Sequence, residues 1–328
     1  MSAIRSILVA VKDADTKQLP VVAKAAQLAR CFGASLELFH AISEPVYAGF
    51  QLTEQSLQEL KSTRVAQHLI RLEGLAAQFR GPEVRISTSA AWDFPAHESI
   101  VRRAIEVKAD LIVAACHDGR RLTPWLMHLT DWELLRTSPM PVLLVRTEEP
   151  YERPIVLAAV DPRHAHAKPS SLDLVVLDTA SHITRALSGS LHAMHAYFPV
   201  PLDVPASDIL TDEQAGRLYT KIEKRARSAF EKCAARAHIP RARRHLVKKN
   251  PVIAIPEVAK EVGTDILVMG AVSRSGLKRI FIGNTAERVL GHVRCDVLVV
   301  KPRRFARRIV KGQRGVRLVA QQLPSVYF

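Results

Sequence analysis

Two stretches of this chain have nearly the same pattern: residues 6–13 read SILVAVKD and residues 154–161 read PIVLAAVD. Each is a short apolar run without polar alternation. Such a run is typical of a strand that is buried on both faces of a parallel sheet, because neither of its faces meets water. The recurrence of this strand predicts that the chain contains an internal repeat.

Two more segments recur later in the chain, now with a spacing of 155 residues. They are residues 109–114 matched to 264–269, and residues 141–146 matched to 296–301. The first pair of strands recurs with a spacing of 148 residues. Because the start, middle and end of the pattern recur in the same order, the sequence indicates two copies of one domain.

The boundary between the two copies falls near residues 147–153, where two glutamates precede Pro150. Proline and charged residues between two periodic segments are typical of a short linker. The predicted ranges are 1–147 for the first domain, 153–302 for the second domain and 303–328 for a basic tail.

Within the first copy, strands are predicted at residues 7–11, 36–41, 84–88, 111–115 and 142–145, the third of them a weaker strand at a sheet edge. Between strands, residues 52–79 and 211–237 carry apolar side chains at helical spacing, and Thr211 with Gln214 forms a predicted capping box. Strands that alternate with helices form right-handed βαβ units. We therefore expect an α/β fold with two tandem five-stranded parallel sheets.

Length and composition exclude several classes of protein. The chain has 328 residues, about twice a typical domain, and 48% of them are hydrophobic, so it is not wholly disordered. No apolar run approaches the roughly 18 residues of a membrane span, and Lys12 breaks the first apolar run too early for a signal peptide. Four scattered cysteines without a CxxC pair argue against a disulfide framework or a zinc site.

The net charge of +15 is concentrated in two segments. Residues 221–249 hold eleven Lys or Arg and two acids, and residues 303–328 hold seven Lys or Arg and no acid. Such clusters attract nucleic acid or an anionic membrane surface. They also fit a solvated helix face followed by a disordered tail, and the tail aromatics are too sparse for base stacking. We expect the tail to be dispensable for folding.

Candidate ligand-binding residues follow two strands of the second copy. In open α/β sheets, ligands bind outside the carboxyl ends of the strands. The first strand there ends at Asp161, and the fourth ends at Gly270. Gly283-Asn284-Thr285 then opens a helix, and a helix start with free N–H groups suits a phosphate.

This loop resembles the G-x-x-G-x(9)-G nucleotide signature of the universal stress protein family, and both halves resemble that family's domain across nearly all of residues 1–302. The resemblance implies an α/β sandwich of the adenine nucleotide alpha hydrolase type. It also implies a cytoplasmic protein that supports resistance to stress such as DNA damage and has no defining catalytic chemistry. The expected cofactor is ATP or another adenine nucleotide, or another small ligand in its place, and no metal.

Transferred residue by residue, the resemblance places Asp161 at the ribose or base and the Ala196 backbone at adenine. The nucleotide-binding set that it implies is Asp161, Ala196, Gly270, Ser273, Gly283, Asn284 and Thr285. Ser273 stands where the family has its second glycine, and its Cβ restricts the approach of the backbone to a triphosphate.

The first copy departs further from the pattern. At the 155-residue spacing, Ala115, Asp118 and His128 replace the three glycines. Asp118 would repel a phosphate, and side-chain bulk at Ala115 and His128 predicts that the first copy does not bind ATP in the family manner. We expect it to serve as a scaffold or to bind a different ligand.

No catalytic residue is predicted. The close histidine pairs, His164 with His166 and His192 with His195, lack nearby Cys or carboxylate ligands for zinc. Ser273 is not within a G-x-S-x-G elbow, and no Walker lysine follows the glycine loop. The alternative function that the sequence leaves open is a nucleic-acid-associated stress protein that uses residues 221–249 and the tail.

The resemblance also implies how the two halves associate. Single-domain members of the family commonly dimerise through the last strand, so residues 142–145 and 297–300 are expected to pair the two halves as an internal pseudo-dimer. A homodimer of the whole chain is left open.

Overall fold

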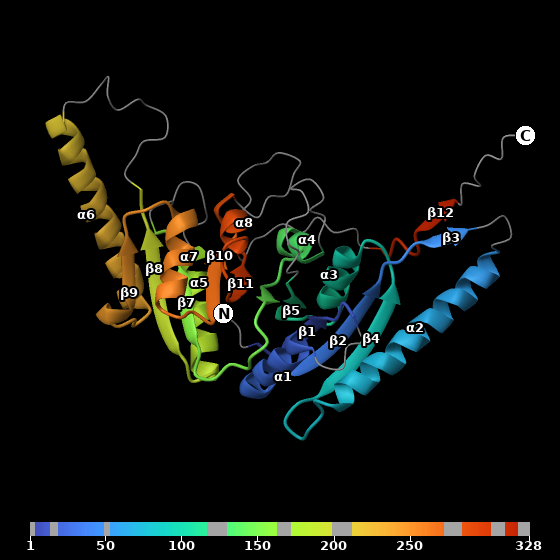
Figure 1. Cartoon of the computed structure of the whole chain (residues 1–328). Coiled ribbons are helices and arrows are strands. Elements are labelled where there is room, and N and C mark those ends of the chain that lie inside the picture. Colours follow the sequence, from blue (N-terminus) through green and yellow to red (C-terminus); the bar gives the residue numbers. More distant parts are fainter. Residues whose placement is uncertain are drawn as a thin grey trace, which may run out of the picture. The chain divides into compact units, whose positions relative to one another are not determined.

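The computed structural model describes residues 4–13, 19–48, 53–116, 130–162, 172–198, 212–271, 284–302 and 312–320. The chain divides into two compact units (Figure 1). The N-terminal unit takes in the described residues of Ala3–Pro150 and of Ala306–Phe328, and the C-terminal unit takes in those of Tyr151–Phe305.

The N-terminal unit contains a parallel sheet with the strand order β4-β2-β1-β5-β6. Its strands are β1 (Ser6–Ala10), β2 (Ser35–Ile42), β4 (Ile86–Trp92), β5 (Leu111–Ala115) and β6 (Val142–Val145). Its helices are α1 (Pro20–Phe32), α2 (Glu54–Ala77), α3 (Ala96–Glu106) and α4 (Thr130–Thr137).

The C-terminal unit repeats this arrangement with the strand order β11-β10-β7-β8-β9. Its strands are β7 (Ile155–Ala159), β8 (Ser190–Ala196), β9 (Arg244–Val247), β10 (Ile266–Gly270) and β11 (Asp296–Val300). Its helices are α5 (Leu172–Ala186), α6 (Asp212–Arg236), α7 (Pro251–Glu261) and α8 (Asn284–Leu290), with a 3₁₀ turn η2 (Arg241–Arg243) before β9. The predicted α/β fold with two tandem domains is confirmed.

Local sequence signals explain where several helices begin and end. α1 starts with Pro20 in its first turn and ends at Gly33, which has a φ of 63° and so adopts the left-handed conformation that glycine allows. α2 begins with a capping box between Thr53 and Ser56. Its apolar stripe is buried only near its end, at Leu72, Leu75 and Ala76. The capping box predicted at Thr211 lies outside the described residues.

The strand pairings of the two units show how the repeat is built. Ile7 lies opposite Leu111 in the N-terminal unit, and Val156 lies opposite Ile266 in the C-terminal unit. The first strand therefore repeats at a spacing of 149 residues, one more than the sequence comparison gave. A slip of one residue would turn every side chain of a strand to the other face of the sheet. The residues of β1 and β7 are therefore matched by their strand pairing and not by the sequence comparison.

Matching aspartates fix this register in both units. Asp110 accepts hydrogen bonds from the backbone N–H groups of Arg5 and Ser6, at 2.8 and 3.1 Å. Asp265, its counterpart, accepts one from Ile155 at 2.7 Å. These acids satisfy backbone groups at the amino end of the first strand, which explains why they recur in the sequence.

The tail does not behave as expected from its composition. β12 (Leu318–Ala320) pairs in parallel with β3 (Val46–Ala48), which forms a second, two-stranded sheet in the N-terminal unit. The expectation that the tail cannot order itself is wrong for residues 312–320, because composition did not reveal the hydrogen-bonding groups that hold them. The pairing of residues 142–145 with 297–300 stays a prediction.

Candidate ligand site at the carboxyl edge of the C-terminal unit

Asp161 is held at the carboxyl edge of the sheet by the first turn of the following helix. The backbone N–H of Val160 donates to the carbonyl of Met194 at 3.0 Å, which continues the sheet beyond β7. The backbone N–H of Asp161 then donates to Oδ1 of Asp173 at 2.9 Å. Asp173 is buried in α5, whereas the Asp161 side chain is 38% exposed. The Asp161 carboxylate is therefore accessible to a ligand.

His195 lies beneath this position. Its side chain is 2% exposed, and Nδ1 lies 3.1 Å from the carbonyl oxygen of Val160. Because a carbonyl can only accept, Nδ1 carries the proton in this contact. The same nitrogen is 3.9 Å from Oδ1 of Asp161, and the ring packs against Phe230 of α6, with centroids 6.1 Å apart. His195 therefore supports the edge on which Asp161 lies.

The structure does not bring the close histidine pair His192 and His195 together. His192 and His195 are both on β8, but an odd spacing along a strand places side chains on opposite faces. His192 instead stacks on His245 of β9, with Nδ1 of the first 3.1 Å from Nε2 of the second. Burial lowers the pKa of both rings. His164 and His166 lie outside the described residues.

Gly270 makes room for a helix side chain. A Cβ atom at this position would lie 2.7 Å from Cδ2 of Leu172, far inside normal contact distance. Leu172 is 1% exposed and begins α5. The glycine that ends β10 is thus explained by packing between this strand and this helix, which is a separate role from cradling a ligand.

Three of the predicted residues lie at the carboxyl ends of neighbouring strands. Asp161 follows β7, Ala196 ends β8 and Gly270 ends β10, and β7 pairs with both of the other strands. Neighbouring strands are about 4.8 Å apart, so these ends form one continuous edge. Asn284 begins α8 and Thr285 is exposed. Ser273 and Gly283 lie outside the described residues.

Lys301 is a residue of this edge that the sequence reasoning did not select. It follows β11, is 6% exposed, and burial lowers its pKa to about 8. The signal was present in the repeat, because Arg146 occupies the matching position in the N-terminal unit and is also basic.

The corresponding edge of the N-terminal unit carries different groups. By the observed register, the counterpart of Asp161 is Lys12, and Ala115 stands in place of Gly270. The matching histidine is retained, since Nδ1 of His40 lies 2.8 Å from the carbonyl of Val11. Asp118 and His128 lie outside the described residues. The two units thus share a scaffold and differ where a ligand would bind.

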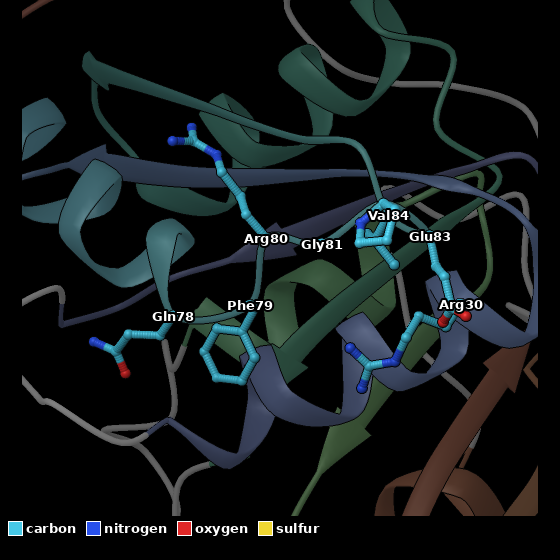
Figure 2. A pocket seen from close by; sticks show the side chains of 8 residues that line it. Arg30, Gln78, Phe79, Arg80, Gly81, Glu83 and Val84 are labelled. Carbon is cyan, nitrogen blue, oxygen red and sulfur yellow. The ribbon is translucent and has the colours of Figure 1, made fainter.

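A hollow of about 590 Å³ lies at the opposite end of the N-terminal sheet, between the end of α1 and the link from α2 to β4 (Figure 2). Figure 2 shows Arg30 on α1 and Phe79, Arg80 and Glu83 on the link. Arg80 is paired with Glu73 at 2.6 Å. This hollow is remote from the carboxyl edges, so it is not part of the candidate site.

In the part of the chain that the structure describes, no group of three or more His, Cys, Asp or Glu side chains is placed to hold a metal ion. Among the same residues, none of the helices combines the length and the apolar character needed to cross a bilayer.

Comparison with known proteins identifies the fold. The model of the universal stress protein family matches twice, at residues 3–146 and 153–301, so the chain belongs to that family and carries two of its domains in tandem. Universal stress protein E of Escherichia coli K12 is 25% identical over 312 residues, which are 93% of this chain and 96% of that protein.

Two further matches support the same arrangement. Universal stress protein E homolog of Haemophilus influenzae is 26% identical over 257 residues, covering 76% of this chain and 81% of that protein. A solved structure of a functionally unknown protein from Pseudomonas aeruginosa PAO1 has a TM-score of 0.65 and 28% identity, and the match covers 92% of this chain and 94% of that one.

Proposed function

We propose that this protein is a cytoplasmic stress protein whose C-terminal unit binds one adenine nucleotide, or a small ligand of similar shape, without turning it over. The observation that carries the proposal is the edge formed by Asp161, Ala196 and Gly270 on three neighbouring strands. Adenine nucleotide binding is also what the sequence resemblance implies. Support of resistance to stress such as DNA damage belongs to the same proposal.

The chemistry of the edge suits a nucleoside. The accessible Asp161 carboxylate accepts hydrogen bonds from ribose hydroxyl groups, and the half-buried end of β8 at Ala196 offers backbone groups and a small side chain to a base. Lys301 is a cation on the same edge when it is protonated, and a bound phosphate would favour that form. The part of the proposal that concerns turnover rests on the sequence resemblance, which implies no defining catalytic chemistry.

Calorimetric titration with ATP, ADP and AMP tests the proposal. The wild type should bind about one nucleotide per chain, because the N-terminal unit has Lys12 and Ala115 at the matching positions. Gly283→Val should abolish binding, since a β-branched side chain fills the space of a phosphate. Ser273→Gly should tighten binding of ATP more than of AMP. Two equivalent sites, or binding unaffected by Gly283→Val, would overturn it.

We also propose that the two halves pair through their last strands, residues 142–145 and 297–300, in place of a homodimer of separate chains. The support is the dimerisation that the resemblance implies for single-domain members. Expression of each half alone tests it, with association measured by analytical ultracentrifugation. A half that is folded and monomeric at high concentration would contradict the proposal.

A further inference from the structure

One face of α6 carries a cluster of exposed cations. With 100° per residue, Lys221, Lys224, Arg225, Lys232 and Arg236 fall within one third of the helix circumference. All five are exposed, and they lie opposite the buried stripe that anchors α6, formed by Ala226, Phe230 and Ala234. We call these five residues the basic face.

The acids near the basic face are engaged elsewhere. Glu223 pairs with Arg227 at 3.1 Å, and Glu231 pairs with Arg244 at 2.5 Å. None of the five cations of the basic face forms an ion pair with another described residue. Their charge is therefore exposed to solvent and is not neutralised by an ion pair within the described part of the chain.

α6 runs beside β9 in the C-terminal unit (Figure 1), and the basic face is the side of this helix opposite its buried stripe. From Lys221 to Arg236 the helix rises about 22 Å, at about 1.5 Å per residue. η2 then adds the exposed side chains of Arg241 and Arg243. Along α6 alone, the array is about as long as six base-pair steps of duplex DNA, which rises about 3.4 Å per step.

We propose that the basic face binds the phosphate backbone of double-stranded DNA, without reading the base sequence and independently of the nucleotide site. A membrane fits less well, because the apolar side of α6 is buried in the unit and cannot insert between lipids. A single strand also fits less well, because the basic face contains no aromatic side chain on which unpaired bases stack.

The described part of the tail takes no part in this surface. The guanidinium of Arg314 binds Glu98, and that of Arg317 lies 5.2 Å from the centre of the Phe94 ring, both in the N-terminal unit. The proposal therefore rests on α6 and η2 alone. The proposed DNA-binding surface is therefore a local feature of the C-terminal unit and does not depend on the net charge of the whole chain.

Fluorescence anisotropy with a labelled 24-base-pair duplex tests the proposal, with the full-length protein at 50 to 200 mM salt. Neutralisation of five phosphates predicts that the logarithm of the binding constant falls with the logarithm of salt with a slope of about −4 to −5. The variant Lys221→Glu, Lys224→Glu, Lys232→Glu should lose binding at least tenfold. An unlabelled duplex of unrelated sequence should compete equally well.

A matched control separates the basic face from net charge. Lys260, Arg288 and Arg294 are exposed cations elsewhere in the same unit, and changing all three to Glu alters the net charge by the same amount. This control should bind the duplex within twofold of the wild type. If the first triple variant does not fold, its Gln equivalent takes its place, with a salt slope lower by about 3.

Three results would overturn the proposal. One is no binding of the duplex at 50 mM salt. Another is an equal loss in both triple variants, which would show a response to net charge only. The third is binding to a single strand or to phosphatidylserine vesicles that is tighter than binding to the duplex and that the basic-face variant abolishes. This result would assign the surface to another partner. Nucleotide titration of the same variants should be unchanged.

Discussion

Lys12 and Asp161 occupy the same position in two copies of one sheet, two residues beyond the end of the first strand of each unit. The backbone around them is the same, because Val11 and Val160 donate matching hydrogen bonds to Phe39 and Met194 at 2.9 and 3.0 Å. The side chains have opposite charge. A ligand that needs a carboxylate at this point therefore finds it only in the C-terminal unit.

Two single variants, each with the charge of the matching position, test whether only the C-terminal unit binds the nucleotide. Asp161→Lys should remove adenine nucleotide binding, because it replaces an acceptor for ribose hydroxyl groups with a cation. Lys12→Asp is the matched control, since it changes the equivalent position of the other unit, and it should leave the affinity within twofold. Calorimetric titration measures both. Loss of binding in the Lys12 variant alone would place the ligand in the N-terminal unit.

The sequence predicted the parts of the structure that depend on local pattern. Continuous apolar runs located β5 and β6 to the residue, because a strand buried on both faces cannot alternate. The recurring aspartates Asp110 and Asp265 were visible as a repeat, although their role in binding backbone N–H groups was not. Domain order and fold class follow from such signals.

Features that depend on contacts between distant residues were not predictable from pattern. The one-residue shift that matches Lys12 to Asp161 is decided by hydrogen-bonding partners on other strands. Likewise, Gly270 appeared as part of a loop signature, and its contact with Leu172 requires the packed helix. For the candidate site, Asp161, Ala196 and Gly270 could be predicted from the sequence, whereas Lys301 and the packing constraints required the structure.

The packing of Gly270 against Leu172 yields a second prediction. Gly270→Ala should destabilise the C-terminal unit by about 1–3 kcal/mol, because its Cβ overpacks against the leucine. Leu172→Ala alone should cost about 2–5 kcal/mol through the cavity that it leaves. The double variant should be more stable than the sum of the two costs predicts. Urea unfolding measures all four proteins.

The same double variant separates packing from ligand contact at Gly270. If this glycine serves packing, the double variant should bind nucleotide within threefold of the Leu172→Ala protein. A folded double variant that has lost binding would instead show that the ligand needs the glycine itself. Additive destabilisation would contradict the packing argument.

Lys301 provides a prediction about pH. Burial lowers its pKa to about 8 from an ordinary 10.5, so between these values the unfolded chain binds a proton that the folded chain does not. Stability contributed by this residue therefore rises with pH over that interval, and the full penalty of burying the charge is present below pH 8. Lys301→Met removes the penalty and should be more stable at pH 7 by on the order of 3 kcal/mol.

The advantage of the Lys301→Met variant should shrink steadily from pH 8 to pH 10.5. Urea unfolding of both proteins at half-unit intervals measures the difference in free energy. Lys260→Met is a control at an exposed lysine and should show no such trend. A difference that is constant with pH would mean that Lys301 is not held in the folded state with a lowered pKa.

The tail makes hydrogen bonds that should stabilise the N-terminal unit. The backbone N–H groups of Arg314 and Gly315 donate to Oδ1 of the buried Asp93 at 2.9 and 3.0 Å. The Arg314 guanidinium donates to Glu98 at 2.7 Å, and Arg317 offers its carbonyl to the N–H of Val46 at 2.8 Å. These bonds are made largely by backbone atoms, which explains why the tail's composition did not reveal them.

Truncation after residue 311 should therefore destabilise the N-terminal unit by about 2 kcal/mol, since bonds to a charged acceptor contribute about 1.5–3 kcal/mol each before the cost of ordering the segment. Truncation after residue 320 retains every bond described above and is the control. Amide hydrogen exchange is the sharpest readout, because Val46 and Phe94 donate their N–H groups to the carbonyls of Arg317 and Gly315. Their protection should be lost in the shorter protein and kept in the longer one. Equal protection in both would show that the segment is not bound in solution.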